Sequence, residues 1–148
     1  MNRTYWLTVA AQEFVQMARD KGYTQVNDGT KTVLEKMSQG DWILYYSPTI
    51  FHEKPKTVCQ KFTGISSVID TYVYPQNAQN QELWRRNVEY FHSIPQQAQQ
   101  FHQQVDFLKQ HPDWTQAFCE PIFEISRNDF LCIAQAIVVP VQNRCLLF

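Results

Sequence analysis

The stretch GDWILYYSP, residues 40–48, decides the fold of this chain. A glycine–aspartate turn precedes five bulky strand-forming residues, and a serine–proline pair ends the run. Because side chains alternate between the two faces of a strand, Trp42, Leu44 and Tyr46 share one face and the residues between them share the other. One of these sets is expected to lie in a core. The other can bring aromatic rings to the rim of a sheet.

Strands and helices are expected to alternate outward from this stretch. Aromatic and β-branched runs predict strands over residues 5–10, 42–46, 61–72 and 83–91. Gly64 is placed to form a bulge where a barrel wall bends. Polar or proline-containing segments predict loops over residues 25–31, 47–58 and 75–81. Two groups of strands, with helices between and after them, predict the α+β class.

Apolar residues spaced by three and four predict helices over residues 12–21, 32–37, 95–110 and 126–136. Gly22 is placed to end the first helix. Thr32 and Glu35 form a capping box for the second, and Ser126 is placed to cap the last. The apolar tail, residues 137–148, is expected to add an edge strand or to pack on the barrel.

The composition bounds the class of protein. A chain of 148 residues with 44% hydrophobic and 18% charged residues is expected to fold as a single domain, residues 1–148. The net charge of −1 lacks the basic signature of proteins that grip long duplexes. Any contact with nucleic acid must therefore use a local patch, a short single strand or one extruded nucleotide.

Metal, cofactor and targeting signals are weak. The chain has four scattered cysteines without a closely spaced pair, namely Cys59, Cys119, Cys132 and Cys145. Zinc ligands normally come in short-spaced pairs, so we expect no metal, no cofactor and reduced thiols in a cytoplasmic protein. No targeting segment and no membrane span is expected.

Catalytic motifs are weak as well. Ser47 lacks the glycine-flanked elbow of the hydrolases, and His52 has no evident partner. The chain has only four glycines and no phosphate-binding glycine loop. The sequence therefore favours a binding protein over an enzyme.

The residues indicate instead an aromatic pocket for an unpaired base. Such a pocket needs rings for stacking, amides for the base edge and cations for phosphate. The candidates are Trp6, Tyr23, Trp42, Tyr45 and Tyr46 for stacking, Gln25 and Asn27 for the edge, and Lys31, Arg85 and Arg86 for phosphate.

Other interpretations of these residues stay open. Trp6 fits the core of the first strand equally well. Asn27 can shape a turn with the aspartate and glycine that follow it. Arg85 and Arg86 point to opposite faces of a strand, so at most one of them can serve a given site.

Four segments together resemble the EVE domain, a PUA-like module related to the YTH readers of modified bases. They are YWLTV at residues 5–9, GYTQVNDG at 22–29, the stretch at 40–48 and WRRNVEY at 84–90. The resemblance covers residues 1 to about 92 well and the rest loosely. It implies a PUA-like mixed β pseudo-barrel with flanking helices.

The resemblance also implies a pocket beside the first helix, at Trp6, at residues 25–27 and at Tyr46, Ser47 and Pro48. Thr49 stands where the family often has a lysine, and Lys31 alone brings charge to the loop after Asn27. Both departures reduce the phosphate contacts that the resemblance implies.

Three classes of function remain at this point. The resemblance implies a reader of a modified nucleobase, such as methylated or hydroxymethylated cytosine or an adenine derivative, in DNA or RNA, with a nuclease or other effector protein as partner. The second is a small PUA-like enzyme acting on a modified nucleoside, as in the related ASCH group, with Lys31 and Glu35 the first residues to test. The third is a protein-interaction domain that uses residues 138–148, whose exposed strand edge would favour a homodimer.

Overall fold

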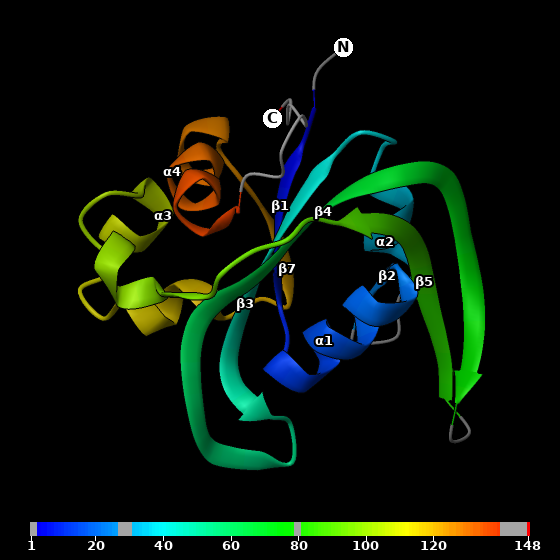
Figure 1. Ribbon diagram of the computed structural model, residues 1–148, viewed down its shortest axis with the longest axis horizontal. Helices are drawn as coiled ribbons and strands as arrows, with labels where there is room; N and C mark the ends of the chain where they lie inside the picture. The colour runs from blue at the N-terminus through cyan, green and yellow to red at the C-terminus, as the bar shows by residue number, and fades with distance from the viewer. Residues whose placement is uncertain (1–2, 27–30, 79–80, 140–147) are drawn as a thin grey trace.

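A computed structural model describes residues 3–26, 31–78, 81–139 and 148, and in these it has one curled, mixed sheet (Figure 1). The strand order is β2-β5-β4-β3-β1-β7, and β6 pairs with β4 off this path. The strands are β1 (Tyr5–Val9), β2 (Tyr23–Gln25), β3 (Trp42–Phe51), β4 (Lys54–Ala78), β5 (Gln81–Tyr90), β6 (Gln96–Gln97) and β7 (Ile122–Ile125). β1 and β3 run parallel, and the other neighbours are antiparallel. The predicted α+β class is confirmed.

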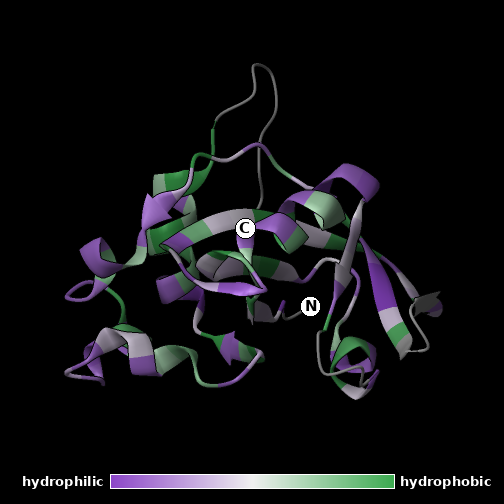
Figure 2. Cartoon of the chain, turned by 90° about the horizontal axis from the view of Figure 1, so that it is seen from below, coloured by the Kyte–Doolittle hydropathy of each residue, from purple (hydrophilic) through white to green (hydrophobic). Residues whose placement is uncertain are grey.

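Helices pack on both faces of the sheet. They are α1 (Gln12–Lys21), α2 (Thr32–Lys36), α3 (Asp106–Lys109) and α4 (Arg127–Ile137), with 3-10 turns η1 (Ala98–Phe101) and η2 (Trp114–Phe118). α3 and α4 lie on one side of β1 and β3, and α1 and α2 lie on the other (Figure 1). Hydrophilic and hydrophobic segments are interspersed along the ribbon (Figure 2), as expected for helices that pack on a sheet through one face only.

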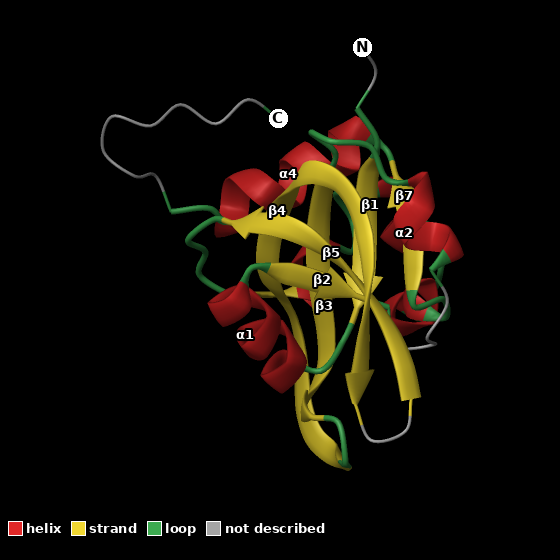
Figure 3. Ribbon diagram, turned by 90° about the vertical axis from the view of Figure 1, so that its right-hand side faces the viewer, coloured by secondary structure: helices red, strands yellow, loops and turns green. Residues whose placement is uncertain are grey.

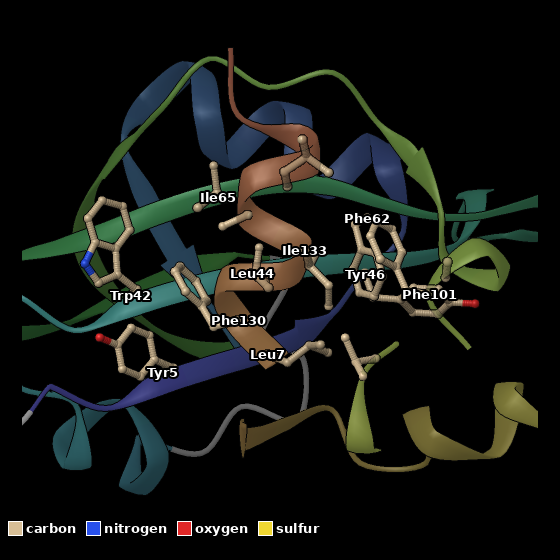
Figure 4. Packing of buried hydrophobic residues seen from close by; sticks show 14 of the residues in the cluster. Tyr5, Leu7, Trp42, Leu44, Tyr46, Phe62, Ile65, Phe101, Phe130 and Ile133 are labelled. Carbon is tan, nitrogen blue, oxygen red and sulfur yellow. The ribbon is translucent and has the colours of Figure 1, made fainter. Parts of the chain in front are cut away.

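Each face of the sheet therefore has its own core. Leu7 and Leu44 face α4, where Phe130 and Ile133 pack across the strands (Figure 4). The alternate residues of β1 and β3, whose side chains point to the other face of the sheet, face α1. They join a second cluster, which includes Ile43. Both sets of residues in the 42–46 stretch are buried, so neither set forms an open aromatic face on the protein surface.

Two long hairpins project in the same direction on either side of α1 (Figures 1 and 3). One joins β3 to β4 and the other joins β4 to β5. The loops predicted over residues 47–58 and 75–81 are therefore largely wrong, because neighbouring strands supply backbone partners that no apolar alternation reveals. The register shifts between Tyr45 and Tyr46, opposite Gly64, which confirms the predicted bulge.

Some of the predicted helix ends are confirmed and others are wrong. Gly22, at φ 78°, ends α1 as predicted, and the Ser126 hydroxyl accepts a hydrogen bond from the backbone amide of Asp129. The capping box of the second helix is wrong, because α2 follows Lys31 and has no side-chain cap. Residues 138, 139 and 148 of the tail are described, and residues 140–147, with Cys145, lie outside the described residues.

The single helix predicted over residues 95–110 is also wrong. The segment breaks into β6, η1 and α3. β6 takes its backbone partners from β4, and the Asp129 carboxylate accepts hydrogen bonds from the amides of Asp106 and Phe107, at 2.9 and 3.2 Å. These contacts come from distant parts of the chain, and they start a new helix in the middle of a helical pattern.

No helix in the described part of the chain is long and apolar enough to cross a membrane.

Candidate ligand-binding cavity

A cavity of about 550 Å³ lies on the α1 face of the sheet. Its walls come from β1, α1, β2, β3, β5 and the turn between β3 and β4. Phe14, Tyr23, Tyr45 and Tyr90 supply aromatic surface. Small-molecule sites typically enclose about 300–1,000 Å³ behind mostly apolar walls with a few convergent polar groups.

Two other depressions are less suited to a ligand. One, of about 650 Å³, is wider open to solvent and is lined by Arg3, Glu124, Arg127 and Phe148 among others. A third, of about 400 Å³, lies beside α2. Neither combines several aromatic walls with convergent polar groups. Within the described residues, no group of three or more His, Cys, Asp or Glu side chains could hold a metal ion.

Two stacked tyrosines form the inner wall of the cavity. The rings of Tyr45 and Tyr90 lie 5.3 Å apart at 28°. The Tyr45 hydroxyl is 2.8 Å from the Ser66 hydroxyl, and the Tyr90 hydroxyl donates to the carbonyl of Tyr23 at 2.8 Å. Burial raises the pKa of both phenols, so both stay neutral at physiological pH. The wall is a fixed, uncharged surface.

A guanidinium is held over an aromatic ring where β2 meets β5. Gln25 pairs with Arg85 in the strand register, and the Arg85 Nε donates to the Gln25 Oε1 at 2.9 Å. The Arg85 Cζ lies 3.8 Å from the centre of the Tyr23 ring. Within the described residues, its Nη groups have no hydrogen-bond partner and no carboxylate lies within 4.0 Å. The Arg85 guanidinium is therefore held in a fixed orientation, is charged, and can donate from its Nη groups to an oxygen of a ligand.

The turn between β3 and β4 closes one end of the cavity. The backbone amide of His52 donates to the Glu13 Oε2 at 2.9 Å, and the His52 ring lies 5.3 Å from the Phe14 ring. Both contacts attach the hairpin to α1. His52 and Glu53 therefore reach the cavity rim from a segment far along the chain.

A threonine hydroxyl in the cavity lining has no partner. Thr8 is 3% exposed, and its Oγ1 makes no hydrogen bond to any described residue. An unsatisfied buried hydroxyl costs about 1–3 kcal/mol, so such groups are uncommon in folded proteins.

The model of the EVE domain matches residues 4–136. The chain belongs to the EVE domain family. Among its relatives, UPF0310 protein YdcG of Bacillus subtilis is 32% identical over 99% of this chain and 100% of its own length. A UPF0310 protein of Streptococcus mutans is 31% identical over 89% of this chain and 95% of its own. The NMR structure of Rpa0253 from Rhodopseudomonas palustris covers 90% of this chain and 92% of its own, at TM-score 0.53 and 15% identity.

The fold of this EVE domain is therefore shared with a solved structure, and the expected PUA-like curled sheet with flanking helices is confirmed. Four residues that the sequence proposed for the pocket do line the cavity, namely Tyr23, Gln25, Tyr45 and Arg85. Ligand binding by these residues stays a prediction.

Three other candidates lie elsewhere in the EVE domain. Trp6 is 5% exposed and its indole N–H donates to Asp41, so it belongs to the core behind the cavity. Tyr46 faces the opposite core, where its ring stacks on Phe118 with centroids 3.7 Å apart. Trp42 also lies in that core. Strand alternation explains why adjacent residues separate in this way.

The end of the stretch also lies outside the cavity lining. Ser47 is fully buried, and its hydroxyl is 2.7 Å from the Thr63 hydroxyl. Pro48 is half-buried within β3. Both belong to a strand that continues where the sequence predicted a stop.

The last three candidates are two cations, Arg86 and Lys31, and the amide of Asn27. Arg86 points away from Arg85 into the protein, where it is 2% exposed. Lys31 lies over the Trp84 ring and pairs with Glu35 at 3.7 Å on the surface. Both members of that pair are half-exposed and outside the cavity, so nothing in their placement favours catalysis there. Asn27 lies outside the described residues.

Sequence reasoning missed Thr8, Thr24, Tyr90 and His52 as lining residues. The period of two along β1 places Thr8 on the same face as Trp6, and this signal could have found it. His52 had no local signal, because a long hairpin brings it to the cavity.

Gly64 is needed for close packing behind the cavity. A Cβ there would lie 3.2 Å from the Val15 Cγ1 and 3.4 Å from the Tyr45 Cδ2. We expect Gly64→Ala to destabilise the protein by about 1 kcal/mol through overpacking. Urea unfolding of Gly64→Ala with and without Val15→Ala measures the coupling. The cost should shrink when Val15 is shortened, and an equal cost in both backgrounds would contradict this explanation.

Proposed function

We propose that this EVE domain binds a modified nucleobase, unpaired or flipped out of a nucleic-acid strand, in the cavity beside α1. The observation that carries the proposal is the Arg85 guanidinium, held by Gln25 over Tyr23 at the cavity lining. A planar cation on a ring offers a stacking surface for a base and a donor fork for an oxygen at once.

The shape of the cavity supports a single nucleotide more than a duplex. A base that is flipped out of a strand loses its stacking on its neighbours, and the aromatic and aliphatic walls of the cavity can replace that stacking. Stacking of a base on an aromatic side chain contributes about 1–3 kcal/mol. The net charge of −1 provides no broad basic face. Exposed Lys54 and Lys56 follow the His52–Glu53 rim in the sequence and can contact the phosphates on either side of the bound base.

The family supports the same proposal at a coarser level. EVE domains are PUA-like modules, and the resemblance of this chain to readers of modified bases implies nucleic acid as the partner. The choice of methylated or hydroxymethylated cytosine, and of DNA or RNA, belongs to the proposal. So does the effector protein for which the domain would supply recognition.

Arg85→Ala should weaken the binding of short single-stranded oligonucleotides that carry a modified base by about tenfold or more, because a charge-assisted contact and a stacking surface are both lost. Isothermal titration with oligonucleotides carrying 5-methylcytosine, 5-hydroxymethylcytosine, N6-methyladenine or no modification measures the effect.

The matched control is Lys31→Ala, which removes the same charge from outside the cavity. We expect it to change affinity by less than about twofold, because an exposed lysine distant from the ligand acts only through a screened field. Equal losses in the two variants would indicate non-specific attraction. Absence of binding to every oligonucleotide would overturn the proposed function.

A further inference from the structure

Buried polar side-chain atoms without a partner are few in the described part of the chain. They are the Thr8 Oγ1, the Arg86 Nε and the Ser93 Oγ. The guanidinium of Arg86 makes hydrogen bonds through its other nitrogens. Ser93 pairs through its backbone with Val138, away from the cavity. Only Thr8 among these three residues lines the cavity beside α1.

Strand geometry sets the side of the sheet on which this hydroxyl lies. Thr8 pairs with Tyr45 in the parallel register of β1 and β3. Leu7 faces α4, so its neighbour Thr8 faces α1, on the side that holds Tyr45 and Val15. The Thr8 side chain therefore lies on the α1 side of the sheet, beside Tyr45 of the tyrosine wall.

The unsatisfied Thr8 hydroxyl lowers the stability of the free protein, so its presence needs another explanation. Valine has nearly the same shape, favours a strand and would leave no polar group unsatisfied there. A polar group kept at such a position is expected where a ligand completes its hydrogen bond.

We propose that the Thr8 hydroxyl is a specificity-determining contact, which hydrogen-bonds a polar substituent on the buried edge of the bound base. The ligand class that fits is a hydroxymethylated pyrimidine, because a hydroxyl can donate to or accept from a second hydroxyl. A methyl group at the same point leaves Thr8 unsatisfied. The inference rests on the proposed function and adds the chemistry of the substituent.

The test compares Thr8→Val with Ser93→Ala, which removes an unpartnered buried hydroxyl far from the cavity. Single-stranded oligonucleotides carrying one 5-hydroxymethylcytosine or one 5-methylcytosine are titrated into each protein by calorimetry. The melting temperature of each free protein is measured in parallel.

Thr8→Val should lose about five- to tenfold in affinity for the hydroxymethylated oligonucleotide and little for the methylated one. Its melting temperature should rise, because an unsatisfied group is removed. Ser93→Ala should raise the melting temperature without changing either affinity. Thr8→Ser keeps the hydroxyl and should retain most of the preference for hydroxymethylcytosine.

Two other results separate the inference from the proposed function. If the unaltered protein binds and Thr8→Val leaves both affinities unchanged, or lowers both equally together with the melting temperature, the inference is overturned and the binding function stands. If the unaltered protein binds neither oligonucleotide, the cavity does not recognise these modified cytosines, and the inference is overturned as well.

Discussion

Arg86→Met should lower the free energy of unfolding by about 3–5 kcal/mol, whereas Arg85→Met should lower it by about 1 kcal/mol or less. The Arg86 Nη1 donates to the carbonyls of Leu34 and Met37, and its Nη2 donates to the carbonyl of Asp70 at 2.8 Å. Methionine fills similar space but leaves three carbonyls without these donors.

The bonds of Arg86 join the end of α2 to β4. Two of the carbonyls lie at the end of α2, and the third lies in β4 where the pairing with β5 shifts between Val68 and Val73. Burial lowers the pKa of the Arg86 guanidinium, which nevertheless stays charged at neutral pH. Its positive charge also suits the carbonyl end of a helix.

Arg85→Met is the matched control for this prediction. It removes the same group one residue earlier, where the described contacts are one hydrogen bond to Gln25 and one contact with the Tyr23 ring. Urea unfolding followed by tryptophan fluorescence gives both values. Similar losses in the two variants would show that the contacts of Arg86 do not carry the stability assigned to them.

This pair of arginines illustrates how far the sequence can predict the site. Strand alternation correctly predicts that Arg85 and Arg86 separate, so that at most one can serve a given site. It cannot say which one faces a cavity, because that depends on where α1 and α2 pack. Strand alternation likewise predicts that Tyr45 and Tyr46 lie on opposite faces of the sheet. Which core each of them joins depends on where α1 and α4 pack.

The fold was predictable where the signal is local. Gly22 ends a helix because of its own backbone freedom, and Ser126 caps one through a residue three positions away. Prediction failed where a distant group decides the outcome. Asp129 starts α3 from another helix, and the long hairpins exist because each strand supplies the partners of the next.

Asp41 organises the backbone beside the first strand. Its Oδ1 accepts from the backbone amide of Thr4 at 3.0 Å. Its Oδ2 accepts from the Trp6 indole at 3.1 Å and from the amide of Ser38 at 2.9 Å. The carboxylate is nearly fully buried, and its three donors belong to β1, to the residue before it and to the turn after α2.

Asp41→Ala should therefore lower the free energy of unfolding by about 3–4 kcal/mol, because it leaves three buried or half-buried donors unpaired. Asp41→Asn should lose less, about 1–2 kcal/mol, since its oxygen can still accept from two donors while its amide faces the third. Urea unfolding measures both, and the NMR shift of the Trp6 indole N–H reports the lost bond directly. If Asp41→Ala matched Asp41→Asn in stability, the network would contribute less than its geometry indicates, and Trp6 would be held by packing alone. If instead the predicted order holds, a single carboxylate in the turn before the 42–46 stretch adds to the pairing with β3 and β7 in holding the strand that carries Thr8.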